Sequence, residues 1–407
     1  MKKIKLIVFT LLAVVFASCN DWVTDIPPTN DMITEAQMST QVNVPFMITG
    51  LHNRLANLSN VWLEADGISD QLFFDLRAGN STYPTYQELD VATSIQYNNS
   101  ASYNLIHLLR MNADSLVGRA LYNIPFTNDA AGTAAKNSAL YWGYLYGGIA
   151  RYVLGAYIGI HQTVGGATIN GSAFIPSADL YTQAIAKLKL ALPYVPDAYS
   201  TRMVNSIIGK VYFMAGDYAN AKTYLNTGLV SGDKPFQSLY SYTTSDNMYR
   251  SQAGEGRQQW AVDNRFADYV TAVPDEAKRI PLVKLSKSGW TYYRQAKYIQ
   301  LPDGSTSPFV FMDWQETNLM IAEIMARQGT AGNMTLINAI RASRGMTTMV
   351  TKDLTLDDIY VERDKELFLR GTRLLDERRF NKPHIAGMWF YIPISQNEID
   401  KNPNLVL

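Results

Sequence analysis

Apolar residues recur at helical spacing through much of the chain. The clearest case is residues 139–157, where one face would carry Tyr141, Tyr144, Leu145, Gly148, Ile149, Tyr152, Val153 and Ala156. Apolar positions at i, i+3 and i+4 predict an amphipathic helix. Because Gly148 and Ala156 are small, this face also allows a close approach by a second helix.

A helical hairpin is predicted next. Ser177 is the expected N-cap of a helix that runs to Leu192 and is ended by Pro193 and Pro196. Another apolar face covers residues 204–215, and a turn at Gly216 and Asp217 leads into a further helix from residue 218 to about residue 229. Helix pairs of this kind are typical of tetratricopeptide repeats, whose units bury their apolar faces by stacking on neighbours.

Three more helices are predicted near the C-terminus. Residues 314–328 and 336–344 form a second helix pair by the same spacing. Residues 356–370 form a charged helix, which begins with Thr355 as its cap and Asp358 three residues later.

Two long stretches, residues 66–102 and roughly 232–308, show no helical pattern and are dense in Tyr, Asn, Ser and Gly. Loops of this length are uncommon in compact domains and usually carry function. We therefore predict a mainly α fold over residues 39–407, a single domain in which tetratricopeptide-like hairpins form a scaffold that displays long irregular loops.

The N-terminus predicts secretion. Lys2, Lys3 and Lys5 precede an apolar run of 11 residues, and the small residues Ala17 and Ser18 come directly before Cys19. This is the pattern of a signal peptide over residues 1–18. A cysteine in this position is typical of bacterial lipoproteins, so we expect Cys19 to carry the lipid and residues 19–38 to form a flexible tether. The alternative is a secreted protein whose cysteine lies there by coincidence.

Composition narrows the choice of ligand. Lys and Arg number 36 and Asp and Glu number 36, so the net charge is zero and no overall field attracts nucleic acid. The single cysteine excludes disulfides within the chain and cysteine-ligated zinc. The 25 Tyr and 7 Trp suit both a large core and a surface that recognises an uncharged ligand.

No catalytic motif is found in the sequence, and the four histidines stand singly. We therefore expect no metal, no cofactor and no enzyme activity. Acidic residues are densest at Asp357, Asp358, Glu362, Asp364, Glu366, Asp376 and Glu377, where they alternate with Arg363, Arg370, Arg373, Arg378 and Arg379. We interpret this cluster as ion pairs that brace the C-terminal helices. The less favoured alternative is a glycoside hydrolase, which needs a pair of carboxylates.

The C-terminal third resembles a known family. The residues that carry the resemblance are 314–323, 336–345, Glu362-Arg363, Glu366-Leu367, Gly371, Arg373, Asp376, Arg379, 389–394, 398–400 and 402–405. These segments are similar to those of the SusD/RagB nutrient-binding outer-membrane lipoproteins of the Bacteroidota. The resemblance implies a protein of tetratricopeptide-based fold that is lipid-anchored in the outer membrane and faces the cell exterior. Such a protein delivers oligosaccharides or peptides to a SusC-like TonB-dependent transporter.

The first stretch carries the residues expected for carbohydrate recognition, which needs flat rings beside polar groups. We expect Asp70, Arg77 and Asn80 to be polar contacts and Tyr83 and Tyr86 to be platforms for sugar rings. The resemblance implies that the loop after Ser69-Asp70 contributes to the ligand site. Trp290, Tyr292 and Tyr293 of the second stretch would complete an aromatic arc. The alternative is that these rings belong to the core.

The sequence therefore predicts a non-catalytic cell-surface lipoprotein that binds glycan and delivers it to a partner transporter. A peptide-binding member of the same family and a tetratricopeptide scaffold for protein partners remain as alternatives.

Overall fold

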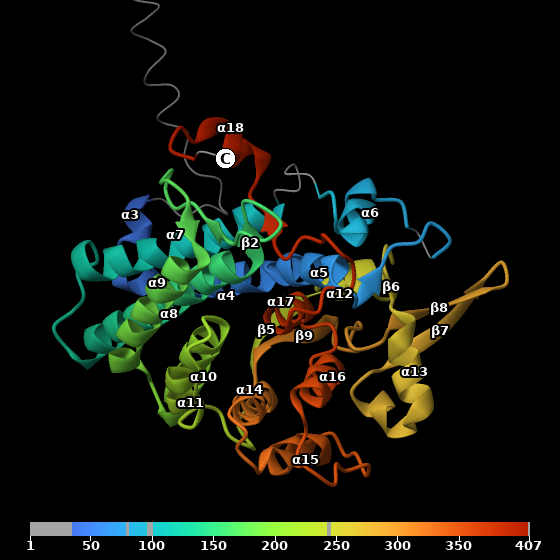
Figure 1. Cartoon of the computed structure of the whole chain (residues 1–407). Coiled ribbons are helices and arrows are strands. Elements are labelled where there is room, and N and C mark those ends of the chain that lie inside the picture. Colours follow the sequence, from blue (N-terminus) through green and yellow to red (C-terminus); the bar gives the residue numbers. More distant parts are fainter. Residues whose placement is uncertain (1–34, 79–80, 96–100, 242–245, 406–407) are drawn as a thin grey trace, which may run out of the picture.

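The computed structural model describes residues 35–78, 81–95, 101–241 and 246–405. Cys19, Asn80, the predicted signal peptide and most of the predicted tether lie outside this part. Helices dominate the described chain, as predicted (Figure 1). In the described residues, no helix is both long and apolar enough to cross a bilayer.

The helices, with the short 3-10 turns, are α3 (Glu35–Met38), η1 (Gln41–Asn43), α4 (Val44–Asn57), α5 (Ser59–Ile68), α6 (Pro84–Val91), α7 (Ala101–Tyr122), α8 (Ala130–Tyr157), α9 (Ser177–Ala191), η2 (Leu192–Tyr194), α10 (Ala198–Met214), α11 (Tyr218–Leu225), α12 (Met248–Ala253), α13 (Asn264–Ala272), η3 (Pro274–Lys278), α14 (Trp314–Arg327), α15 (Asn333–Ser343), α16 (Leu356–Glu366), α17 (Arg373–Phe380) and α18 (Gln396–Lys401). The strands are β1 (Leu72–Phe73), β2 (Ile158–Gly159), β3 (Gly166–Ala167), β4 (Ile175–Pro176), β5 (Phe236–Ser241), β6 (Ala261–Val262), β7 (Leu282–Lys287), β8 (Trp290–Gln295), β9 (Ser305–Met312) and β10 (Ile392–Pro393).

Helix pairs form the scaffold. α8 packs against α7 and α9, α10 packs against α9 and α11, and α14 packs against α11, α15 and α16. In Figure 1 these pairs follow one another through the molecule in chain order. Each pair buries its apolar face against the next, which is the packing expected of tetratricopeptide-like hairpins.

The close approach predicted for Gly148 is present between α8 and α9. A Cβ atom on Gly148 would lie 2.6 Å from Cγ of Leu188. The turn at Gly216 and Asp217 is also present: Gly216 has a φ of +78°, and Asp217 caps α11 by accepting a hydrogen bond from the backbone N–H of Asn220 at 3.1 Å.

The predicted cap at Ser177 is wrong. Pro176 holds the N-cap position, and Ser177 is the first residue of α9. The Ser177 hydroxyl instead donates to the carbonyl oxygen of Gly155 at 2.6 Å, so it joins the start of α9 to α8. The tertiary contact with α8 therefore takes the hydroxyl that the sequence pattern assigns to a cap.

The second stretch is not the irregular loop that we predicted. Residues 232–308 contain β5 to β8, the start of β9, α12 and α13. β5 pairs with β9, and a four-stranded sheet has the order β1-β6-β8-β7. β6 has only two residues, which is too short to show the alternation by which a strand is recognised. β5, β7 and β8 have six residues each, but apolar and polar residues do not alternate strictly along them.

The last predicted helix is too long. α16 begins as predicted, with a capping box formed by Thr355 and Asp358, but it ends at Glu366. Leu369 and Gly371 both have positive φ values, of 51° and 68°, so the chain leaves the helical conformation there.

One continuous core joins the scaffold to the sheet. Every residue of α5 except Asn60 is buried, and α5 contacts α4, α6, α7, α12, α17 and β1. Gly67 of α5 makes one of these approaches possible, because its missing Cβ would lie 2.5 Å from the ring of Trp260. The core therefore fixes the positions of the segments around the sheet.

Candidate functional site

The four-stranded sheet brings the two aromatic stretches together. β1 belongs to the first stretch, and β6, β7 and β8 belong to the second. Ala78, Ala261 and Tyr292 form a small buried cluster on which Phe73 and Trp290 pack. Phe73 of the first stretch and Trp290 and Tyr292 of the second therefore lie in one region.

Trp290 is a half-buried ring of this region. It stacks on Tyr292, with ring centroids 4.9 Å apart and an interplanar angle of 16°. The guanidinium carbon of Arg77 lies 4.3 Å from the centroid of the Trp290 ring. We call Arg77, Trp290 and Tyr292 the tryptophan cluster.

Asp75 holds Arg77 in this position. Its carboxylate accepts hydrogen bonds from the backbone N–H of Arg77 at 2.8 Å and from the Nε of Arg77 at 2.9 Å. Hydrogen bonds from Arg77 lower the pKa of Asp75 below its usual value, so the carboxylate stays charged. The Arg77 side chain keeps 63% of its surface exposed and can still meet a ligand.

A second group of rings surrounds Tyr83. The guanidinium carbon of Arg257 lies 4.3 Å from the Tyr83 ring centroid, and Arg257 also donates a hydrogen bond to the Tyr83 hydroxyl. Tyr83 is half-buried and contacts Tyr86, which in turn packs on Trp260 with centroids 5.2 Å apart. We call Tyr83, Tyr86, Arg257 and Trp260 the tyrosine cluster.

Gln259 fixes the tyrosine cluster to the sheet. Its side-chain oxygen accepts hydrogen bonds from the backbone N–H groups of Thr82 and Tyr83 at 2.8 and 3.1 Å. Its backbone oxygen accepts a hydrogen bond from the Ser81 hydroxyl at 2.7 Å. Because Gln259 and Trp260 directly precede β6, the segment that carries Tyr83 is tied to the sheet that carries Trp290.

Of the other residues predicted to bind ligand, Tyr86 and Tyr292 have little exposed surface, and Tyr293 lies outside the two clusters. Tyr86 is 8% exposed and Tyr292 is 5% exposed, so both mainly support the rings above them. Tyr293 follows Tyr292 on β8 and packs against the main core, because successive side chains of a strand point to opposite faces. Asn80 lies outside the described residues. The roles of these residues in binding remain predictions.

Asp70 is held by two arginines. Arg373 Nε donates to it at 2.7 Å and Arg265 Nη2 at 2.8 Å. Burial alone would raise the pKa of Asp70, but the hydrogen bonds and charges of Arg373 and Arg265 outweigh it, and the pKa is lowered. In the described structure, Asp70 is thus part of an ion-pair network.

Solved structures share this architecture. A SusD superfamily protein from Bacteroides vulgatus superposes with a TM-score of 0.70 and 17% identity, over 90% of this chain and 100% of that one. A laminarin-binding SusD-like protein gives 0.67 and 13%, over 90% and 98%. Surface glycan-binding protein A from Bacteroides uniformis gives 0.67 and 14%, also over 90% and 98%. The chain has the SusD-like fold.

The expected resemblance is thereby confirmed at the level of the fold. By sequence, no protein-family model and no curated protein matches the chain. The SusD-like fold of this chain is therefore supported by its three-dimensional arrangement rather than by sequence similarity.

Three residues in and beside the tyrosine cluster were not predicted from the sequence: Arg257, Gln259 and Trp260. All three lie in a short segment, residues 254–260, between α12 and β6. The signal that could have found them is the run Gly-Arg-Gln-Gln-Trp, in which a guanidinium, amides and a ring occur together. This run lies in the middle of a long stretch of similar composition, so the sequence alone does not set it apart.

Most of the acidic C-terminal cluster forms ion pairs, as predicted, whereas Asp358 caps α16. Arg363 pairs with Asp376 at 2.8 Å, and Arg341 with Glu362 at 2.5 Å. The cations around Glu362 lower its pKa to about 2 in spite of its burial. Among the described residues, no group of three or more His, Cys, Asp or Glu side chains is arranged to hold a metal ion.

Proposed function

We propose that the protein is a non-catalytic glycan-binding protein, and that the tryptophan and tyrosine clusters form its ligand site. The observation that carries this proposal is the pairing of a half-buried ring with an exposed guanidinium in each cluster, Trp290 with Arg77 and Tyr83 with Arg257. The names of two proteins with the same fold, one laminarin-binding and one surface glycan-binding, support the same class of ligand.

The chemistry of the two clusters suits a sugar chain. The flat face of an indole or phenol packs on the C–H face of a pyranose and removes apolar surface from water. The guanidinium that lies over each ring has several N–H donors, which match hydroxyl groups at the edge of the sugar. Asn80, in the same segment as Arg77 and Tyr83, is a further proposed polar contact.

We propose further that the protein acts at the cell exterior. The support for this part is the N-terminal pattern, in which Cys19 would carry the lipid that anchors the chain in the outer membrane. In this arrangement the protein captures oligosaccharide and delivers it to a SusC-like TonB-dependent transporter.

The glycan site is tested by removing single rings. We expect Trp290→Ala and Tyr83→Ala each to weaken oligosaccharide binding by about tenfold, because each removes the apolar contact of one ring. Calorimetric titration with a panel of neutral oligosaccharides, laminarin fragments included, measures the effect. Tyr122→Ala is the matched control, because Tyr122 is 84% exposed at the end of α7.

Two results would contradict the proposal. Unchanged affinity in both ring variants would place the ligand elsewhere. Release of reducing ends by the purified protein would favour a hydrolase. Titration with peptides in parallel tests the peptide-binding alternative, which binding of peptides and not of oligosaccharides would favour. Binding of neither class would favour a scaffold for protein partners.

A further inference from the structure

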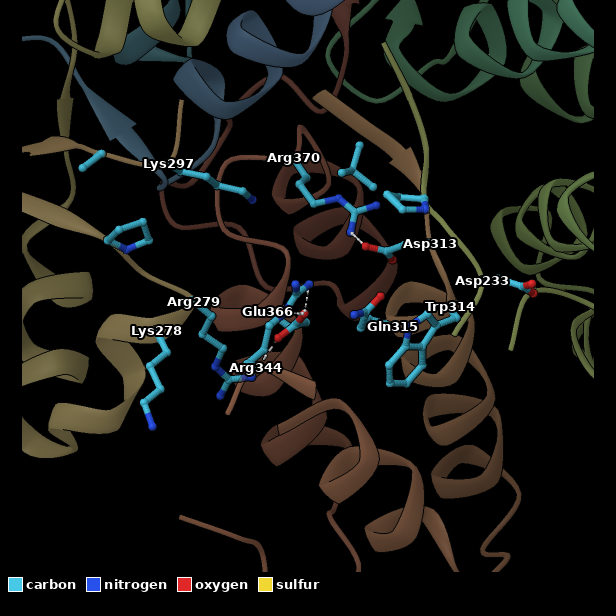
Figure 2. A pocket seen from close by; sticks show the side chains of 14 residues that line it. Asp233, Lys278, Arg279, Lys297, Asp313, Trp314, Gln315, Arg344, Glu366 and Arg370 are labelled. Carbon is cyan, nitrogen blue, oxygen red and sulfur yellow. Dashed lines mark hydrogen bonds and ion pairs between the residues drawn. The ribbon is translucent and has the colours of Figure 1, made fainter. Parts of the chain in front are cut away.

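A pocket of about 380 Å³ lies among the segments that lead into and out of the C-terminal helices (Figure 2). The pocket is lined by residues before β5, at the end of η3, after β8, on β9, at the start of α14, after α15, and at and after the end of α16. The pocket shares no lining residue with the tryptophan or tyrosine cluster. An inference about it is therefore independent of the proposed glycan site.

Charged side chains dominate the wall of this pocket. The cations are Lys278, Arg279, Lys297, Arg344 and Arg370, and the anions are Asp233, Asp313 and Glu366. Most of them are already paired: Arg370 with Asp313 at 2.8 Å, and Arg344 with Glu366 at 2.7 Å. These pairs hold the wall in place and neutralise most of its charge.

Lys297 differs from the other cations. Its Nζ donates a hydrogen bond to the carbonyl oxygen of Phe368 at 2.5 Å, and in the described part of the chain no carboxylate forms an ion pair with it. An ammonium group has three N–H donors, so two remain for another acceptor. In Figure 2, Lys297 extends towards Arg370.

The surroundings of Lys297 are unfavourable for a lone positive charge. Burial, followed by the charges of Arg370 and Arg344, lowers its pKa to about 7. Arg370 is only 5% exposed, and its Nε has no hydrogen-bond partner within the described structure. Two N–H donors of Lys297 and the Nε of Arg370 thus make no hydrogen bond within the described structure.

We propose that this pocket binds a small anionic ligand, through a carboxylate or other oxyanion that lies against Lys297. The anion would accept the two remaining hydrogen bonds of Lys297 and add a negative charge beside it, where the carboxylates of Asp313 and Glu366 are already paired with Arg370 and Arg344. Charge-assisted hydrogen bonds of this kind are the strong ones. The volume lies at the lower end of the range for small-molecule sites and has room for a monosaccharide-sized molecule.

The rest of the wall fits the uncharged part of such a ligand. Pro235, Pro281, Val310 and Trp314 add apolar surface, and Gln315 adds an amide. An acidic sugar combines an oxyanion with a partly apolar ring and hydroxyls, so it is the class that uses all of these groups. Free phosphate offers the same oxyanion chemistry without the ring.

Calorimetric titration of the purified protein tests the site with glucuronate, inorganic phosphate and glucose. We expect an anion to bind and glucose not to bind. Lys297→Met should weaken anion binding by about tenfold or more, because a hydrogen bond to a charged group is lost, and Lys297→Arg should retain most of it. Lys401→Met, at an exposed lysine that ends α18, should leave it unchanged.

A second measurement needs no variant. Acylation of Lys297 by an activated acetate ester, followed by mass spectrometry, should be slowed by the bound anion and not by glucose. Tighter binding of glucuronate would identify an acidic sugar, and tighter binding of phosphate a free oxyanion. The proposal is overturned if neither anion binds, if Lys297→Met binds as well as the unchanged protein, or if no anion protects Lys297.

Discussion

Two carboxyl groups of α5 are buried in the core. Glu64 is 2% exposed and accepts hydrogen bonds from Asn60 and Ser102, while Asp66 accepts hydrogen bonds from the Tyr249 hydroxyl at 2.5 Å and the Gly371 N–H at 3.0 Å. Burial raises the pKa of each to about 7, although these hydrogen bonds oppose the rise. Both groups therefore link folding to protonation.

Glu64→Gln tests this link. Between the ordinary pKa of 4.5 and the folded value of about 7, the folded chain keeps a proton that the unfolded chain has released. The free energy of unfolding therefore falls as pH rises through this window. Glutamine does not titrate, so the free energy of unfolding of the variant should not show this fall. Relative to the unchanged protein, we expect the free energy of unfolding of the variant to rise by about 2 kcal/mol between about pH 5 and about pH 8.

Urea denaturation at the two pH values measures the change. Asp179→Asn, at an exposed position of α9, is the control and should leave the difference between the two pH values unaltered. Parallel stability profiles for Glu64→Gln and the unchanged protein would show that Glu64 is charged in the folded state.

At the scale of elements, the contact between α8 and α9 depends on a missing side chain. A Cβ atom at Gly148 would stand 2.6 Å from Cγ of Leu188 and 3.1 Å from the carbonyl oxygen of Ala184. The second of these atoms belongs to the backbone and cannot move without shifting α9. The spacing of the two helices is therefore set by the size of one residue.

We expect Gly148→Ala to lower the free energy of unfolding by ~1–3 kcal/mol through overpacking. Gly118→Ala on α7 is the matched control, because no atom outside the neighbouring turns of its own helix lies within 4 Å of its Cβ position. That substitution should raise stability by ~0.5–1 kcal/mol, since alanine loses less backbone freedom on folding. Chemical denaturation measures the free energy of unfolding of both variants. If the two substitutions changed it by the same amount in the same direction, the close contact at Gly148 would be contradicted.

Helices and strands differ in how far the sequence predicts them. α8, α9, α10, α11, α14 and α15 were predictable because each shows several turns of one apolar face. α5 is buried on nearly all sides, so its residues show no such stripe. β1 and β6 have two residues each and are defined only by the strands beside them.

At the scale of the whole molecule, Asp70 connects segments that lie far apart in the chain. It follows α5 and pairs with Arg265 of α13 and Arg373 of α17, at 2.8 and 2.7 Å. Arg265 also reaches Asp364 of α16 at 3.0 Å. This network ties the sheet region to the C-terminal helices.

Asp70→Asn separates a bracing role from a ligand contact. We expect it to lower the free energy of unfolding by about 3 kcal/mol, because two largely buried guanidiniums lose a shared counter-charge. Asp75→Asn, which affects the exposed pair with Arg77, should change stability little. Unchanged stability of Asp70→Asn with lost oligosaccharide binding in titration would instead favour the ligand contact expected from the sequence.

The sequence by itself determined the helical scaffold, the turn at Gly216 and the nature of the acidic C-terminal cluster. These features depend on residues a few positions apart, which the sequence displays directly. Only the tertiary structure decided that Trp290 is accessible while Tyr292 is buried, and that Arg257 joins Tyr83. Exposure and partnership of a side chain depend on segments that meet across the fold, and the pocket around Lys297 likewise exists only where η3, α14 and the segment after α16 come together.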